Sequence, residues 1–292
     1  MITYVSYRLA AFVSRTLAPR ACYRLAGRVA AVFHALDRAG RHAVERNLAV
    51  VLRARGGEPD PAELRRLARL TFENFGKYLA DFFRYSRSSA SEVARMIRIE
   101  NGDYMRQATA LERGVLVASG HVGNWELGGM LVSSMGYRLN AVAMPQRLQN
   151  VNRLFEAQRA GRGIRVLPLG HAAKGILLSL RRREWVALLA DRDFNQHSPE
   201  ALFFGRPARL PRGPAYLAVR TRAPVLPGFV LRQPDDTFVL RFFPPIIPDE
   251  RTTQEDVQGR ICRVLEDVIG AHPAQWFMFR DLWGDGPNGP AG

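Results

Sequence analysis

The sequence predicts an α/β protein with a mostly parallel central sheet flanked by helices, preceded by an amphipathic helical N-terminal segment. After residue 98, short apolar runs rich in β-branched residues alternate with helical segments, which is typical of parallel strands buried on both faces. Before residue 98, apolar residues recur at helical spacing. The 292 residues are enough to build a large hydrophobic core.

Composition narrows the class of protein. The longest nearly continuous apolar run covers residues 223–231 and is broken by Pro224 and Pro227, which excludes a polytopic membrane protein. Cys22 and Cys262 are the two cysteines, so we expect neither a disulfide framework nor a cysteine-rich metal site, and a cytosolic setting. The net charge of +15 favours anionic partners such as phospholipid headgroups or an acidic carrier protein. A soluble basic protein without such a partner is the alternative.

The first 55 residues hold ten arginines and two acids. Arg8 and Arg15 lie seven residues apart in a stretch whose apolar residues follow helical spacing: Ile2, Val5, Leu9, Phe12, Val13 and Leu17. We expect a basic amphipathic helix that ends at Pro19, and a similar helix over 21–36. These helices either pack on the core or lie in an anionic membrane surface, and the two arrangements are compatible.

The remaining elements follow in order. Asp60 resembles a helix N-cap before Pro61, and the helix it begins extends to about Arg84, followed by a short helix over 88–97. Strands are expected at 114–119, 139–144, 164–169, 185–190, 225–231 and 238–243. Helices are expected at 125–135, 150–160, 172–180, 214–221 and 253–269.

These elements suggest one structural domain with three regions. Residues 1–97 form a helical region that associates with a membrane and caps the rest. Residues 98–283 form the α/β region that carries the site, and the Gly- and Pro-rich residues 284–292 form a disordered tail.

The segment 119–129 follows a predicted strand and begins a predicted helix, the place where open α/β sheets build active sites. His121 in this loop can act as a general base if a carboxylate orients it. Glu126 stands five residues later, so the two side chains must meet across a turn, or each must meet another partner. A capping histidine beside a solvated glutamate is the alternative interpretation.

The spacing from His121 to Glu126 matches the H-x4-D/E signature of the glycerolipid acyltransferase superfamily. The string Gly-His-Val-Gly-Asn-Trp-Glu resembles the branch of the bacterial lipid A late acyltransferases and the phosphatidylinositol mannoside acyltransferases. Further blocks are similar to that branch in the same order: 41–48, 72–80, 190–193, 203–207, 211–215 and 272–276.

The resemblance implies a glycerol-3-phosphate acyltransferase-like fold and acyl transfer from a thioester, acyl-ACP or acyl-CoA, to a hydroxyl of a phosphorylated glycolipid. His121 would deprotonate the hydroxyl, which attacks the thioester directly, so no metal and no cofactor beyond the acyl co-substrate is expected. The chain has neither a G-x-S-x-G nor an H-E-x-x-H motif, which is consistent with this chemistry.

The resemblance also assigns residues to the site. The carboxylate partner of His121 is either Glu126 or Glu200, and in the second case Glu126 holds an arginine instead. That arginine maps onto Arg159, with Arg162 as the alternative register. Asn124 and Trp125 are expected to bind substrate, and the region around Trp125, Met130 and Leu131 to line an acyl groove.

Asp191, Arg192 and Asp193 end a predicted strand, where they form either a structural ion network or a substrate site. Residues 201–232 contain six arginines and no acid. Arg206, Arg209 and Arg212 are expected to receive acceptor phosphates or an acidic carrier protein, unless they form an ordinary basic face.

We therefore expect a peripheral or monotopic O-acyltransferase on the cytoplasmic face of the inner membrane. Its partners would be a glycolipid acceptor, an acyl thioester and an anionic membrane surface. No nucleic acid is expected, since the chain lacks a helix-turn-helix or zinc signature. A lysophospholipid acyltransferase and a non-catalytic basic membrane-binding protein are the alternatives.

Overall fold

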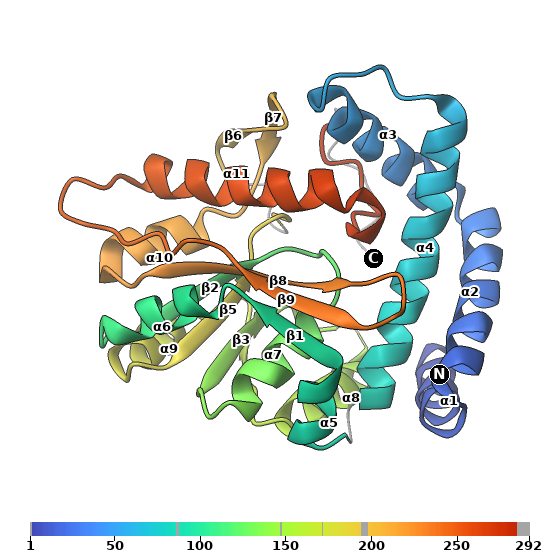
Figure 1. The fold of residues 1–292 in the computed structure, drawn as a ribbon, viewed down its shortest axis with the longest axis horizontal. Coiled ribbons are helices and arrows are strands. Elements are labelled where there is room, and N and C mark those ends of the chain that lie inside the picture. The colour runs from blue at the N-terminus through green and yellow to red at the C-terminus, as the bar shows by residue number, and fades with distance from the viewer. Residues whose placement is uncertain (1, 86–87, 147, 171, 194–197, 285–292) are drawn as a thin grey trace.

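The computed structural model describes residues 2–85, 88–146, 148–170, 172–193 and 198–284. A seven-stranded sheet lies among helices, and a group of N-terminal helices stands along one end of it (Figure 1). The strands of this sheet are β1 (Ile97–Glu100), β2 (Val115–Ser119), β3 (Leu139–Ala143), β4 (Arg165–Pro168), β5 (Trp185–Leu189), β8 (Val225–Arg232) and β9 (Phe238–Phe242). A separate hairpin is formed by β6 (Glu200–Phe203) and β7 (Arg206–Arg209).

The strand order in the large sheet is β1-β9-β8-β2-β5-β3-β4. Every neighbouring pair is parallel except β8 and β9, which pair antiparallel. This confirms the predicted α/β fold with a mostly parallel sheet. The order places β2 in the centre, between β8 and β5.

The N-terminal helices are α1 (Ile2–Thr16), α2 (Pro19–Leu36), α3 (Arg38–Ala54) and α4 (Pro61–Arg84). Pro19 begins α2, so α1 ends where the proline predicts. Asp60 caps α4 as expected, because its carboxylate accepts a hydrogen bond from the backbone N–H of Ala62 at 3.0 Å. The other helices are α5 (Ala90–Met96), α6 (Gly102–Ala110), α7 (Trp125–Ser134), α8 (Gln149–Ala160), α9 (Ala172–Arg181), α10 (Gly213–Thr221), α11 (Gln254–Ala271) and the 3₁₀ turn η2 (Pro273–Gln275).

Two buried clusters cover the two faces of the sheet. Along β8, Phe229 and Leu231 belong to a cluster with α9, α10 and α11, whereas Leu226 and Val230 belong to a cluster with α5, α6 and α7. Because side chains alternate along a strand, the two clusters lie on opposite faces. This double burial explains the continuous apolar character of the central strands.

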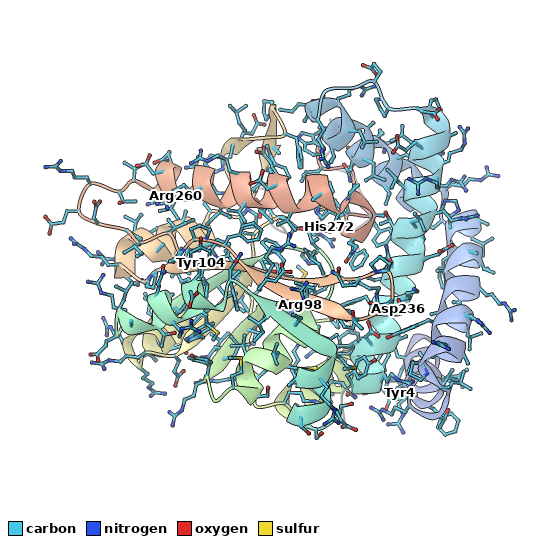
Figure 2. The ribbon with its side chains drawn as sticks, viewed as in Figure 1. Tyr4, Arg98, Tyr104, Asp236, Arg260 and His272 are labelled. Carbon is cyan, nitrogen blue, oxygen red and sulfur yellow. The ribbon has the colours of Figure 1, made fainter. Side chains whose placement is uncertain are left out.

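The N-terminal helices are tied to both the sheet and the C-terminal segment. In α3, the Asn47 side chain donates to the carbonyl oxygens of Met278 and Arg280 and accepts from the N–H of Leu282. In α4, Lys77 pairs with Asp236 at 2.7 Å, and Figure 2 shows Asp236 in the turn between β8 and β9 beside α4. Of the expected disordered tail, residues 285–292 lie outside the described residues.

No helix in the described part of the chain combines the length and apolar character needed to span a bilayer.

Candidate active site

His121 lies in the loop that joins β2 to α7, at the carboxyl end of the central strand. Gly123 makes this loop possible: its φ is +64°, and a Cβ atom there would lie 1.9 Å from the carbonyl oxygen of Val230. At Gly120 a Cβ atom would lie 3.3 Å from Cγ of Asp191. The loop therefore runs tightly between β8 and the residues that follow β5.

Asp191 is the carboxylate that contacts the His121 ring. Its Oδ1 lies 2.8 Å from His121 Nδ1, and its Oδ2 accepts the backbone N–H of His121 at 2.8 Å. Trp276 also donates its indole N–H to Oδ2 at 3.0 Å. The carboxylate is fully buried, while 15% of the His121 side chain is exposed. Three donors therefore fix one buried carboxylate behind a partly accessible imidazole.

The surroundings of Asp191 favour its charged form. Burial alone would raise the pKa of this carboxyl, but the charge of His121 and the hydrogen bonds from His121 and Trp276 outweigh burial and lower the pKa. A carboxylate on Nδ1 makes this nitrogen the hydrogen donor, so Nε2 is the ring nitrogen that carries the lone pair. The arrangement can serve as a general base of the kind used in acyl transfer.

The sequence analysis proposed Glu126 or Glu200 as the partner of His121, and neither occupies that position. Glu126 lies in the first turn of α7 and receives the Arg159 guanidinium from α8, with Nε at 3.1 and 3.2 Å from its two oxygens. This is the alternative in which Glu126 holds an arginine, and Arg159 is the arginine in question. His121 precedes the turn at Gly123 and Glu126 follows it. The turn therefore separates the His121–Asp191 contact from the Glu126–Arg159 contact.

The Glu126–Arg159 pair is almost completely buried, with 8% and 16% of the side chains exposed. Burial lowers the pKa of Arg159, but the adjacent Glu126 carboxylate outweighs this and raises it. Arg162, the alternative register, points elsewhere and donates to the carbonyl oxygen of Ser88. The pair therefore clamps α8 to the start of the helix that follows His121.

Glu200 begins β6, where it is exposed and lies 3.9 Å from Arg209 on β7. These two residues are also direct partners in the antiparallel hairpin register. Within the described residues no contact joins Glu200 to His121. The cross-strand position thus explains why Glu200 is not the partner that the sequence suggested.

Asn124 is a buried structural residue rather than an accessible substrate ligand. Its Oδ1 accepts the N–H of Leu127 at 3.2 Å and caps α7, and its Nδ2 donates to Asp81 of α4 at 3.0 Å. Asp81 also accepts the Tyr23 hydroxyl of α2 at 2.6 Å and an N–H of Arg232 from β8. We call Tyr23, Asp81, Asn124 and Arg232 the buried polar cluster. It links α2, α4 and β8 to Asn124, the N-cap residue of α7, which follows the loop that carries His121.

Trp125 lies beside His121, with ring centroids 5.2 Å apart and the planes at 72°. It also packs on Tyr78 of α4 at 4.4 Å and near Phe277. Trp125 thus forms part of the wall next to the base, and its expected contact with substrate stays a prediction. Met130 and Leu131 are buried in the core, and the acyl groove expected around them stays a prediction.

The other two members of the 191–193 block have separate surroundings. Asp193 accepts the N–H of Ser198 at 2.9 Å. Arg192 is half-buried; burial and the neighbouring charge of Arg280 lower its pKa, although Asp191 acts in the opposite direction. The guanidinium of Arg192 therefore lies between the influence of one like charge and one opposite charge.

The three arginines expected to bind phosphates do not converge. Arg206 is exposed on β7, and Arg209 faces Glu200 on the same hairpin. Arg212 precedes α10 and pairs with Glu255 at 3.2 Å. The described residues contain no group of three or more His, Cys, Asp or Glu side chains placed to hold a metal ion. The expected absence of a metal from the reaction stays a prediction.

Sequence reasoning missed the roles of Asp191, Trp276 and Asp81. A signal for Asp191 was present, because it follows a predicted strand and β5 lies directly beside β2 in the sheet. Ser119 pairs with Leu189, and the N–H of Ala190 donates to the carbonyl oxygen of Ser119 at 2.8 Å. Strand adjacency was the missing information.

Comparison with known proteins places these features in context. The sequence profile described as "Bacterial lipid A biosynthesis acyltransferase" matches residues 2–284. A phosphatidylinositol mannoside acyltransferase of Mycobacterium tuberculosis (strain ATCC 25618 / H37Rv) is 31% identical over 250 residues, covering 84% of this chain and 77% of the relative. One from Mycolicibacterium smegmatis is 27% identical over 259 residues, covering 86% and 82%.

Among solved structures, the 1-acyl-sn-glycerophosphate (LPA) acyltransferase PlsC from Thermotoga maritima matches with a TM-score of 0.39 and 14% identity. The match covers 86% of this chain and 97% of that chain.

Proposed function

Because the chain belongs to the bacterial lipid A biosynthesis acyltransferase family, we propose that this acyltransferase moves a fatty acyl chain onto a hydroxyl of a phosphorylated glycolipid. The donor is an acyl thioester, carried by acyl carrier protein or coenzyme A. The observation that supports the chemistry best is the His121–Asp191–Trp276 arrangement at the carboxyl end of β2.

His121 acts as the general base in this mechanism. Its Nε2 takes the proton from the acceptor hydroxyl while Asp191 stabilises the imidazolium that forms. The resulting alkoxide attacks the thioester carbonyl carbon, and the C–S bond then breaks. The leaving thiolate receives the proton from Nε2, which returns His121 to its starting state. The new ester and the free thiol account for every atom.

The acceptor is inferred from the relatives. Those named above act on phosphatidylinositol mannosides by their names, and the family is described by lipid A biosynthesis. A phosphorylated glycolipid is the substrate class that these names share. Arg192, which follows Asp191 and has Arg280 as a neighbouring charge, provides positive charge that suits a phosphate-bearing donor or acceptor.

The N-terminal helices support attachment to a membrane surface. Along α1, Val5, Leu9 and Phe12 are 57–65% exposed, and α2 exposes Val32, Phe33 and Leu36 to 57–75%. Exposed apolar residues among arginines suit a helix lying in an anionic interface. We place the enzyme at the cytoplasmic face of the inner membrane, as a peripheral or monotopic protein.

The test is a lipid profile by mass spectrometry of cells with and without the gene, complemented with the wild type or with His121→Ala. We expect one glycolipid to lack a single acyl chain without the gene, and only the wild type to restore it. Purified enzyme should lose about 10²–10⁴-fold of its turnover in the variant. Wild-type turnover in His121→Ala, with the fold confirmed by circular dichroism, would contradict the mechanism. Transfer to lysophospholipid alone would contradict the acceptor.

A further inference from the structure

A groove lies between α1 and α8, away from His121. Its cavity volume is about 620 Å³, within the range of small-molecule sites. The lining residues are Arg8, Ala11, Phe12, Arg15, Thr16, Leu154, Ala157 and Gln158. Phe12 lines the groove and is also 65% exposed, so the groove borders the outward apolar face of α1.

The polar part of the groove is cationic. Arg8 and Arg15 lie two turns apart on α1, about 10 Å along the helix axis, so their long side chains can reach one anion between them. None of the lining residues is acidic. Arg8 is exposed and has no ion-pair partner within the described ranges.

Arg15 is held in position by neighbouring helices. Its Nε donates to the carbonyl oxygen of Phe83 at 3.2 Å, and its Nη2 lies 3.4 Å from Oε1 of Gln158. Both of these acceptors are neutral groups, and the two contacts orient the guanidinium toward the groove that it lines. An arginine held in this way suits a phosphate, because its planar guanidinium can donate two parallel hydrogen bonds to the phosphate oxygens.

The remaining wall is apolar. Ala11 and Phe12 from α1 and Leu154 and Ala157 from α8 supply this part of the lining. This surface offers an acyl chain a contact that a free phosphate ion cannot use. Val5 and Leu9 are exposed on α1 as Phe12 is, and they extend the apolar surface beyond the groove. A bilayer lipid would enter the groove from this surface.

We propose that this groove binds one anionic phospholipid of the bilayer, with its phosphate between Arg8 and Arg15 and its first acyl carbons against Phe12 and Leu154. The proposal rests on the membrane attachment proposed above. The bound lipid would contact the last turns of α8, where Gln158 precedes the Arg159 that holds Glu126. The groove is therefore separate from His121, and α8 connects the two regions through the contact of Arg159 with Glu126.

The test uses soluble short-chain lipids below their micelle concentration, titrated into the full chain by isothermal titration calorimetry. We expect dihexanoylphosphatidylglycerol to bind saturably with one site per chain, and inorganic phosphate and dihexanoylphosphatidylcholine to bind at least tenfold more weakly. Arg8→Gln should weaken binding at least tenfold by removing charge. Ala157→Trp should do the same by filling the groove without changing charge.

Arg28→Gln is the matched control, because Arg28 is an exposed arginine on α2 and does not line the groove. It should bind like the wild type. Equal weakening in Arg28→Gln, unchanged binding in Ala157→Trp, absence of saturation, or equally tight phosphate binding would each overturn the proposal. The titration needs no acyl donor, so its failure is distinct from a failure of the acyl-transfer proposal.

Discussion

At the scale of single residues, the proposed mechanism depends on the hydrogen bond between Asp191 and His121. Asparagine in place of Asp191 keeps the size of the side chain but removes the negative charge. That charge sets the tautomer of the neutral His121 ring and stabilises the imidazolium that forms from it. We expect Asp191→Asn to lower kcat by about 10²–10⁴-fold with a much smaller change in KM. Steady-state acyl transfer with purified enzyme measures both constants.

Glu126→Gln is the comparison for this variant, because Glu126 contacts Arg159 instead of His121. It should reduce kcat less than Asp191→Asn does. The reverse order of the two losses would make Glu126 the functional partner of His121.

The same carboxylate links folding to pH. Its pKa in the folded protein is below the ordinary value of 3.8, so the folded state binds fewer protons than the unfolded state. The stabilisation is complete above that ordinary value and is lost as the pH falls through the lower folded-state value. The advantage of the wild type over Asp191→Asn in free energy of unfolding should therefore shrink in urea titrations as the pH falls below about 5.

The sequence pointed to His121 as the candidate base but not to the carboxylate that contacts it, for a geometric reason. His121 stands in a recognisable loop, and the Glu126–Arg159 contact was one of the stated alternatives. Asp191 is 70 residues from His121, and the two meet only because β2 and β5 are neighbours. Asn124 was expected to bind substrate. In the structure it is buried, and its Oδ1 accepts the N–H of Leu127 and so caps α7.

At the scale of elements, the buried polar cluster joins α2 and α4 to the start of α7. Removing the Tyr23 hydroxyl leaves the Asp81 carboxylate with one donor fewer in a buried site. We expect Tyr23→Phe to reduce the free energy of unfolding by about 1–3 kcal/mol, measured by urea denaturation.

Tyr85→Phe is a suitable control for Tyr23→Phe, because the Tyr85 hydroxyl lies 3.4 Å from that of Tyr23 and belongs to the outer edge of this network. It should destabilise the protein less. Equal losses of unfolding free energy in the two variants would show that the hydrogen bond from Tyr23 to Asp81 has no special importance for stability.

Most elements were predictable because burial dictates their composition. The strands β2, β3, β4, β5, β8 and β9 were all predicted to within a residue or two at each end, since they are apolar. The edge strand β1 was missed, because two of its four residues are charged and it is half exposed. The hairpin β6–β7 and helix α6 were also missed, and the antiparallel pairing of β8 with β9 is set by tertiary contacts rather than by local sequence.

At the scale of the whole molecule, the proposed membrane attachment assigns the bilayer contact to the outward faces of α1 and α2. Phe33 and Leu36 at the end of α2 are 60% and 75% exposed. We expect Phe33→Glu with Leu36→Glu to weaken binding to vesicles containing phosphatidylglycerol at least tenfold in a sedimentation assay, because both substitutions place charge in the apolar interface.

Leu178→Glu controls for the loss of exposed apolar surface in general, since Leu178 lies on α9 and is 40% exposed. It should sediment with vesicles like the wild type. If the α2 variant sediments equally well, these helices do not form the membrane contact.

The attachment of α2 to the buried polar cluster limits how this enzyme can be engineered. Tyr23 bonds to Asp81 from the inner side of α2, while Phe33 and Leu36 are exposed on the same helix. Deleting the helix to obtain a soluble preparation would open the cluster that caps α7 and disturb the loop that carries His121. A detergent-free form is better obtained by point substitutions on the outer face, which leave every internal bond of the helix in place.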